Sequence, residues 1–217
     1  MAELIEVQSK PARTRRSIVQ AAIHLYREIG HRKTTVADIA RSASMSSANV
    51  YRFFACKQAV EDAVVAELLE DIAIAATKAA RTGGSALSRL QATLGAIAEV
   101  NQARRAKDPK LHELMVVAVR QNWPAVVRHT DRIRGLVRPI IGTGEASGEL
   151  ASGSPMVLTC CLLDAMDAYL SPPRLDETGI RPSFEEMMHF CADALRRAPT
   201  APSVSTMPDV RLRAVGE

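Results

Sequence analysis

The sequence predicts an all-α fold in which a small N-terminal helical domain precedes a larger one. Apolar residues recur at helical spacing along most of the 217 residues, and no stretch alternates polar and apolar residues for long, as a half-buried strand would. Aromatic residues make up only 4% of the chain, while Ala, Leu, Ile, Val and Met are abundant. A chain of this length can bury a substantial core as one large or two small domains.

The positive charge is concentrated at the N-terminal end. Residues 1–57 hold ten Lys and Arg against four Asp and Glu, whereas the remainder holds eighteen against twenty. A basic end on a near-neutral body is typical of a protein that binds nucleic acid and has a second task. A basic head that docks on an acidic partner or a membrane surface would show the same pattern, so charge alone does not decide between them.

An arm and a supporting helix come first. We expect residues 1–12 to form a flexible basic arm, whose side chains either track phosphate or simply stay solvated. From residue 13 to 29, Ile18, Ala22, Leu25 and Ile29 form the apolar stripe of an amphipathic helix, and Gly30 ends it. This helix would support the two that follow.

A short helix is predicted to begin at Val36. Thr35 is placed to cap it, and Asp38 stands three residues further on, where a capping box has its acidic partner. Val36, Ile39 and Ala40 then supply an apolar face that needs a partner. After a polar break around Ser44, the sequence indicates a second short helix.

The second short helix is capped by Ser46 or Ser47 and anchored by Val50 and Phe54, four residues apart. Its other side carries small hydroxyls, an amide, a phenol and a guanidinium. Such an edge suits a DNA groove, because small groups allow close approach, Asn can pair bidentately with adenine, and Arg can reach guanine or phosphate. The two helices therefore predict a helix-turn-helix.

The residues just described resemble the DNA-binding domain of the TetR family of bacterial transcriptional repressors. The resemblance covers about residues 13–64 and is carried by Gly30, Thr34-Thr35-Val36, Asp38-Ile39-Ala40, Ser46, Val50-Tyr51, Phe54 and Lys57, all at the family's spacing. The chain departs from the family pattern at Ser44 and Ala48, where glycine is common, and at Gln58, where an acidic residue is common. The departures at Ala48 and Gln58 prevent transfer of a base preference, whereas Ser44 weakens only the turn.

The resemblance and the exposed edge together give nine candidate DNA contacts. They are Thr34, Thr35, Ser46, Ser47, Ala48, Asn49, Tyr51, Arg52 and Lys57. Asn49 and Arg52 are expected to read bases, whereas Tyr51 and Lys57 are expected to contact phosphate. The alternatives are that Thr35 is only a cap, that Tyr51 packs on the protein, and that Lys57 is a solvated lysine opening the next helix. The predicted DNA-binding domain is residues 13–57.

Six more helices are expected in a second domain, residues 58–198. Their ranges are about 57–80, 85–102, 109–120, 124–141, 154–170 and 183–198. Pro139 should kink the helix at 124–141 or end it early. A basic exposed loop is expected at 104–107, and further loops at 142–153 and 171–182. Asp108 and Ser154 are expected as caps before prolines, and Ser183 with Glu186 as a capping box. Residues 199–217 are predicted to be disordered.

The resemblance implies a homodimer that packs helices 154–170 and 183–198 against those of its partner and binds a palindromic operator. It also implies release by a small effector that shifts helix 57–80. The apolar tilt of the middle helices favours an apolar or amphipathic effector. Candidate lining residues are His112, Met115, Val119, Arg120, Trp123, Val127, Met156 and Asp164, with Val126 and His129 beside them. Such residues are more often plain core or surface than ligand contacts.

Other function classes find little support in the sequence. No GxSxG, HExxH, P-loop or dinucleotide fingerprint is present, so neither an enzyme nor a cofactor or metal site is expected. The four cysteines have no CxxC spacing and suit a reducing cytoplasm, although Cys56 beside Lys57 leaves a redox role open. No signal peptide or membrane span is expected, since no apolar run reaches eighteen residues. The alternative function is an all-helical interaction protein with a basic docking head.

Overall fold

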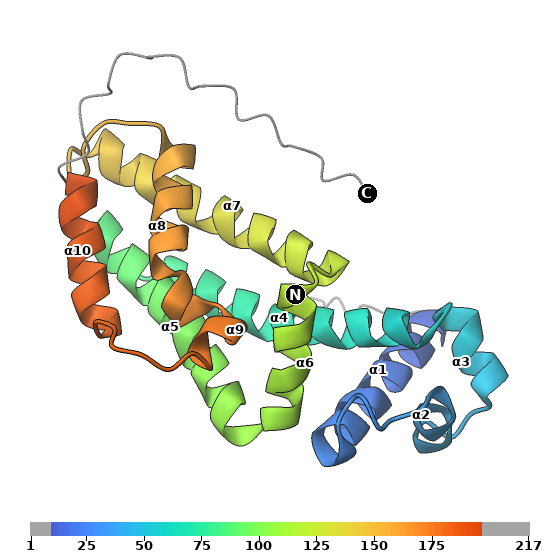
Figure 1. Cartoon of the computed structure of the whole chain (residues 1–217). Helices are drawn as coiled ribbons and strands as arrows, with labels where there is room; N and C mark the ends of the chain where they lie inside the picture. The colour runs from blue at the N-terminus through green and yellow to red at the C-terminus, as the bar shows by residue number, and fades with distance from the viewer. Residues whose placement is uncertain (1–9, 197–217) are drawn as a thin grey trace, which may run out of the picture.

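The computed structural model describes residues 10–196, and within this range the chain forms helices and no strand (Figure 1). The helices are α1 (Lys10–Ile29), α2 (Val36–Ser42), α3 (Ser47–Phe53), α4 (Lys57–Ala80), α5 (Ala86–Lys107), α6 (Pro109–Arg120), α7 (Pro124–Ala146), α8 (Pro155–Leu170), α9 (Pro172–Leu175) and α10 (Phe184–Arg196). The all-α prediction is confirmed. Residues 1–9 and 197–217, which include most of the predicted arm and the predicted tail, lie outside the described residues.

Helices α1 to α3 form a small head at one end of the molecule (Figure 1). Ile18 and Tyr26 of α1 meet Ile39 of α2 and Val50 of α3, and all four are fully buried. Gly30 ends α1 with φ +88°, a left-handed conformation that favours glycine. The chain can therefore turn directly into the loop before α2, as the sequence predicts.

Helix α4 connects the head to the rest of the chain. Its 24 residues span about 36 Å, and Val60, Val64, Leu68 and Ile72 bury one side along its whole length. It packs on α1 at its start, and on α5 and α7 further along. One continuous helix thus contacts both the head and the core of the larger part.

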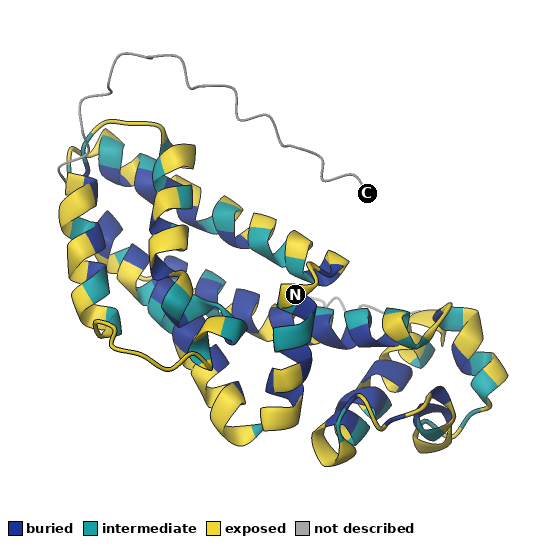
Figure 2. Ribbon diagram, in the orientation of Figure 1, coloured by how far each residue is buried: buried dark blue, intermediate teal, exposed yellow. Residues whose placement is uncertain are grey.

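Helices α5 to α10 form the body, with α4 at its centre (Figure 1). Large buried side chains from α5, α6, α7 and α8 meet there, among them Leu90, Leu114, Ile140 and Met166. The predicted capping box at α10 is confirmed, because Ser183 N donates to Glu186 Oε2 at 2.7 Å and Glu186 N donates to Ser183 Oγ at 3.1 Å. Figure 2 shows that much of α8 and α10 is exposed on the face turned to the viewer.

Polar contacts join the end of α1 to the start of α6. Arg27 Nε lies 2.7 Å from Asp108 Oδ1, and Lys110 Nζ donates to the backbone oxygen of Glu28. Arg32 Nε in the following loop lies 3.3 Å from Glu113 Oε1. We call these three contacts the α1–α6 contact; they hold the head in one orientation on the body.

Two predicted loops are helical instead. Helix α5 continues to Lys107, and the supposedly exposed Arg104 is buried: its Nη2 donates to Leu68 O at 2.8 Å and its Nη1 to Asn101 Oδ1 at 3.4 Å. Helix α7 passes Pro139 and ends at Ala146, so the loop begins later than predicted. In α5 the contact of Arg104 with α4 favours the longer helix over the local sequence pattern.

Asp108 and Ser154 occupy the predicted N-cap positions before the prolines of α6 and α8, but neither side chain makes a capping hydrogen bond. The Asp108 carboxylate accepts from Arg27 instead. The short α9 also lies where only a loop was predicted. Among the described residues, no helix combines the length and apolar character needed to cross a membrane.

Candidate nucleic-acid interface and effector cavity

The first helix of the predicted helix-turn-helix is closed by a full capping box. Asp38 N donates to Thr35 Oγ1 at 3.2 Å, and Thr35 N donates to Asp38 Oδ2 at 3.0 Å. The Thr35 hydroxyl also donates to that carboxylate at 2.6 Å. The hydrogen bonds from Thr35 lower the pKa of Asp38 below its usual range; burial opposes them, and Arg41 lowers the pKa further. The start of α2 is thus fixed by residues three apart in sequence.

The turn between α2 and α3 contains a left-handed serine. Ser44 has φ +53°, a left-handed conformation that favours glycine, and Met45 N donates to Ala40 O at 2.9 Å across the turn. Ser46 then caps α3, since Asn49 N donates to Ser46 Oγ at 3.2 Å. Ser46, rather than Ser47, is therefore the cap.

The inner side of α3 is anchored in the head. Val50 is fully buried, and Phe54, immediately after the helix, is only 3% exposed. The Arg15 guanidinium of α1 lies 4.5 Å from the centre of the Phe54 ring, a cation–π contact. These anchors leave the opposite edge of α3 turned away from the protein.

The outer edge of α3 is open. Ser46, Ala48, Tyr51 and Arg52 are exposed, and Tyr51 shows 52% of its surface. Ser47 and Asn49 are half-buried, with Asn49 Nδ2 lying 3.6 Å from Met45 Sδ. The amide, phenol and guanidinium thus share a short, rigid helix with small neighbours, as a helix that enters a DNA groove requires.

Thr34 does not belong to this exposed set. It is 1% exposed, and its hydroxyl donates to Gly30 O at 2.9 Å, so the prediction of a DNA contact by its side chain is wrong. Lys57 is also engaged: its Nζ donates to His31 O at 2.7 Å and lies 3.5 Å from Glu61 Oε1. Lys57 therefore ties the loop after α1 to the first turn of α4, a role that the sequence did not reveal.

A buried polar cluster lies behind Lys57. His31 Nδ1 is 3.3 Å from Glu61 Oε1, both residues are 7% exposed, and the Tyr26 ring packs edge-on to His31 with centroids 6.3 Å apart. Burial, reinforced by the Glu61 charge, raises the pKa of the Tyr26 hydroxyl. The cluster joins α1, the following loop and α4 where the head meets the body.

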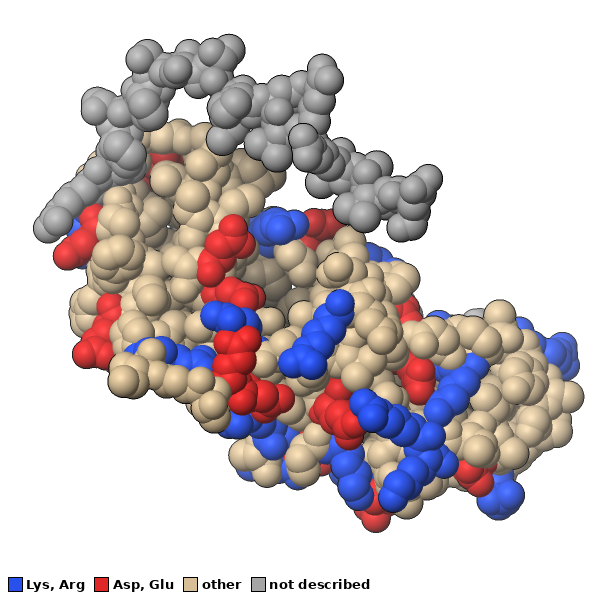
Figure 3. All heavy atoms as spheres, in the orientation of Figure 1, with Lys and Arg blue, Asp and Glu red and all other residues tan. Residues whose placement is uncertain are grey.

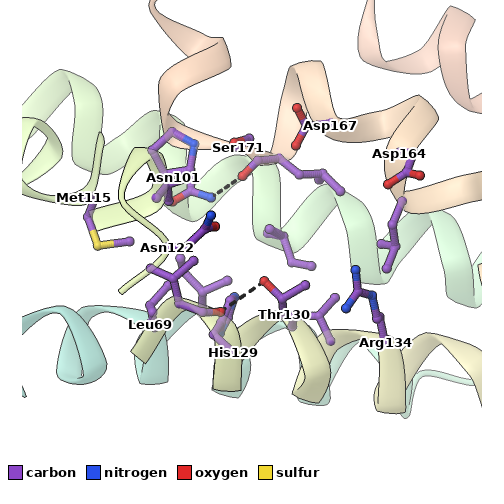
Figure 4. Close-up of a pocket in the computed structure, with 18 residues that line it drawn as sticks. Leu69, Asn101, Met115, Asn122, His129, Thr130, Arg134, Asp164, Asp167 and Ser171 are labelled. Atoms are coloured by element: carbon purple, nitrogen blue, oxygen red, sulfur yellow. Dashed lines mark hydrogen bonds between the residues drawn. The ribbon is translucent and has the colours of Figure 1, made fainter. Parts of the chain in front are cut away.

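A cavity of about 250 Å³ lies in the body between α4, α5, α6, α7 and α8 (Figure 4). Its wall is mainly apolar, with polar and charged side chains from α5, α7 and α8. The lining residues are Leu69, Ile72, Ile97, Asn101, Met115, Val119, Asn122, Val126, His129, Thr130, Ile133, Arg134, Leu163, Asp164, Asp167, Leu170, Ser171 and Pro172. An apolar pocket with a few convergent polar groups is the usual form of a small-molecule site.

Three of the eight predicted effector residues line this cavity. Met115 and Val119 contribute from α6 and Asp164 from α8, and the neighbours named with them, Val126 and His129, contribute from α7. Asn101, Thr130, Arg134 and Asp167, which the sequence reasoning did not name, line it too. Helical spacing alone could not show which side of α5 or α7 faces inward.

Two predicted residues, His112 and Trp123, lie apart from the cavity because other contacts take their side chains. His112 is buried with its Nε2 3.1 Å from Asp176 Oδ2, on a different hollow that Asp176 also lines. Trp123 is buried where it begins α7, and its indole Nε1 donates to Gln121 Oε1 at 2.9 Å. Neither residue is available to a ligand in this cavity.

The remaining three predicted residues point to the surface. Arg120 is exposed at the end of α6, and Val127 shows 49% of its surface on the outer side of α7. Met156 shows 47% in the first turn of α8. The prediction that these three line the cavity is wrong.

His129 is the polar group whose state is clearest. Its burial, with the Arg132 charge beside it, lowers its pKa to about 4. The ring is therefore neutral near pH 7 and can both donate and accept a hydrogen bond. No hydrogen bond from the described residues reaches its ring nitrogens, so they are free to meet a ligand.

Fold and site together define the class of protein. A three-helix head whose third helix is capped and faces outward is a helix-turn-helix DNA-binding domain, and it is attached to a helical body with a ligand-sized cavity. A family model described as bacterial regulatory proteins, tetR family, matches residues 18–64, and one described as tetracyclin repressor-like, C-terminal domain, matches residues 86–188. The chain belongs to the TetR family of bacterial transcriptional regulators. Members of this family are not enzymes; they bind DNA and typically dimerise and bind small-molecule ligands.

Solved structures show the same fold. A TetR/AcrR-family transcriptional regulator from Thermobifida fusca has a TM-score of 0.61 at 22% identity, covering 85% of this chain and 97% of that one. The TetR-family regulator PfmR from Thermus thermophilus has a TM-score of 0.54 at 19% identity, covering 83% and 97%. The fatty acid degradation regulator FadR from Bacillus halodurans has a TM-score of 0.61 at 13% identity, covering 87% and 96%. Among curated proteins, none matches the chain significantly.

Proposed function

We propose that the protein is a homodimeric repressor that binds a palindromic operator in the cytoplasm and is released by a small amphipathic ligand. The observation that carries this proposal is the outer edge of α3, which is open from Ser46 to Arg52 while Val50 and Phe54 fix the helix from behind. Residues 13–57 would be the DNA-binding domain and residues 58–198 the effector-binding and dimerisation domain.

The contacts to DNA divide by chemistry. Asn49 and Arg52 would read bases, Tyr51 would donate its hydroxyl to a phosphate, and Ser46, Ser47 and Ala48 would let the helix approach closely. Thr35 would contact phosphate in addition to capping α2. The Lys57 ammonium is already bound to His31 O, so it would support the head and add charge to the interface.

The dimer would form through α8 and α10. Val157 on α8 and Phe190 on α10 expose 58% and 69% of their surfaces, which is costly for large apolar side chains unless another surface covers them. A two-fold pairing there would carry two recognition helices, which must lie about 34 Å apart to enter successive major grooves.

Release would pass through the two helices that contact both the cavity and the head. Leu69 and Ile72 of α4 line the cavity, and Lys57 holds the head at the other end of the same helix. Met115 and Val119 of α6 also line it, and Lys110 at the start of α6 bonds to α1. A ligand that binds the DNA-incompetent arrangement better by roughly 1–3 kcal/mol would suffice.

Fluorescence anisotropy with the promoter region of the protein's own gene tests this proposal. We expect binding that survives competitor DNA, weaker binding of Tyr51→Phe to all sequences alike, and a changed preference at one base position for Asn49→Ala. Arg52→Ala should weaken binding, whereas Arg81→Ala, with the same loss of charge at the far end of α4, should not.

Equal binding to every sequence, or unchanged binding in all three α3 variants, would contradict the repressor. Binding that depends on charge alone would instead favour the second candidate, a helical interaction protein whose basic head docks on an acidic partner or membrane surface.

A further inference from the structure

The charged side chains around the cavity are mostly acidic. Asp164 and Asp167 line it from α8, whereas Arg134 on α7 is its basic residue, and His129 is neutral. Figure 4 shows the two carboxylates on one side of the space and His129 and Arg134 on the other. In Figure 3 a hollow opens near the middle of the body, with acidic side chains along one side.

The neighbours of these groups leave a negative balance. Arg134 Nη1 lies 3.3 Å from Asp131 Oδ1 on the same helix, so its charge is already partly offset. Asp167 Oδ2 lies 3.6 Å from Arg174 Nε, a loose ion pair. Asp164 has no hydrogen bond or ion pair with any residue of the described range 10–196.

The Asp164 charge also acts on its neighbour Asp167. Three residues apart on one helix, they face the same side, where like charges repel. Burial raises the pKa of Asp167; the Arg174 charge and a hydrogen bond with Ser171 oppose this, and the Asp164 and Glu177 charges add to it. A positive group between them would relieve both the repulsion and the lost hydration.

The rest of the cavity suits the remainder of a small molecule that carries such a positive group. The neutral His129 ring does not repel a cation and can accept a hydrogen bond from it. Leu69, Ile72 and Ile133 offer an apolar wall. A volume of about 250 Å³ is below the range of about 300–1,000 Å³ that is usual for drug-sized ligands, which favours a compact molecule.

We propose that this cavity binds a compact organic cation, a protonated amine on an apolar body, with its ammonium between Asp164 and Asp167 and its body against Leu69, Ile72 and Ile133. The inference deepens the proposed function, because the cation would be the effector. An organic carboxylate of the same size is rejected, since it would meet two carboxylates and a guanidinium that Asp131 already engages.

Thermal unfolding of the full chain with three matched probes tests the assignment. The probes are 2-phenylethylamine, 2-phenylethanol and 3-phenylpropanoate, which share a phenyl body and differ in charge. The amine should raise the melting temperature in proportion to the logarithm of its concentration, the alcohol should raise it less, and the carboxylate should not raise it.

Asp164→Asn is the decisive variant, because Asp164 is exposed and makes no contact that the fold needs. It should weaken amine binding by roughly three- to fivefold, the range of an ion pair that water still reaches, and leave alcohol binding unchanged. Glu99→Gln, the same change on an exposed residue of α5 outside the cavity lining, should leave both unchanged.

Three results would overturn the cation site: no shift with the amine at about 10 mM, a carboxylate shift as large as the amine shift, or unchanged amine binding in Asp164→Asn. The DNA measurement is made without ligand and stands apart. Binding of the operator without binding of the amine would contradict only the cation site, whereas binding of the amine without binding of an operator would contradict only the repressor proposal.

Discussion

Glu149, in the loop after α7, caps a helix that lies far away in the sequence. Its Oε2 accepts from Ala86 N at 2.6 Å and its Oε1 from Leu87 N at 3.0 Å, at the start of α5. Burial works against the charged form, but hydrogen bonds from Leu87, Ser85 and Ala86 prevail and lower the pKa of Glu149. Glu149→Gln keeps one acceptor oxygen and turns an amide NH₂ toward the other backbone N–H.

The magnitude follows from what is lost. A hydrogen bond to a charged group contributes about 1.5–3 kcal/mol, and a negative charge at a helix N-terminus about 0.3–1 kcal/mol. Water still reaches the half-buried Glu149, so we expect the free energy of unfolding to fall by about 1–2 kcal/mol at pH 7. For a chain of this size each kcal/mol lowers the melting temperature by about 2–4 °C.

The difference in the free energy of unfolding between wild type and Glu149→Gln should shrink as the pH falls. Because the folded-state pKa of Glu149 is lowered, its contribution is fully present above the ordinary value of 4.5 and is lost as the pH falls through the folded-state value. Urea unfolding of wild type and Glu149→Gln at neutral and acidic pH, at one protein concentration, measures this, with Glu99→Gln as the control. No difference at neutral pH, or one that persists unchanged in acid, would refute the capping role.

Three further predictions concern the turn, the body and the dimer. Ser44→Gly should raise the free energy of unfolding by up to about 1 kcal/mol, and with it the melting temperature, because φ +53° suits glycine. The affinity for DNA should stay unchanged. Gly144→Ala should cost about 1–3 kcal/mol in urea unfolding, since its Cβ would lie 2.7 Å from side-chain atoms of Ala86 and Leu150, whereas Gly135→Ala in the same helix meets nothing within 4 Å and should not destabilise. The Phe190→Glu variant should sediment as a monomer. The control Ile74→Glu replaces another apolar residue, 58% exposed on α4, and should remain a dimer. A dimeric Phe190→Glu variant would exclude α10 from the interface.

The helix-turn-helix could be predicted because its determinants are local. Thr35 with Asp38 and Ser46 with Asn49 each act across three residues, and the structure contains the hydrogen bonds that this spacing predicts. The apolar pair Val50 and Phe54 likewise fixes which side of α3 is buried. Sequence periodicity is sufficient where a helix needs to bury only one side.

The errors arose where a side chain finds a partner far away in the sequence. Arg104 looks like part of a basic loop until Leu68 O, 36 residues earlier, accepts its hydrogen bond. Lys57 and Asp108 are similarly taken by His31 O and Arg27. No local pattern announces such pairings, because they depend on how whole helices dock.

The cavity shows the same limit. Met115 and Asp164 were predicted on general grounds, whereas Asn101 lines the cavity from α5 and its amide donates to Leu170 O of α8 at 2.8 Å, a pairing that the sequence does not show. Which face of α5 or α7 turns inward is decided by the packing of five helices around one space, and that information is distributed over the whole body.

The α1–α6 contact has a consequence for binding measurements. Arg27 with Asp108 and Arg32 with Glu113 are partly exposed ion pairs, which dissolved salt weakens over a Debye length of about 10 Å at 0.1 M. Raising ionic strength should therefore loosen the orientation of the head on the body, and it also reduces the free energy gained when counterions are released from a duplex. The slope of log affinity against log salt would then exceed what the phosphate contacts alone produce, and counting contacts from that slope would overestimate them.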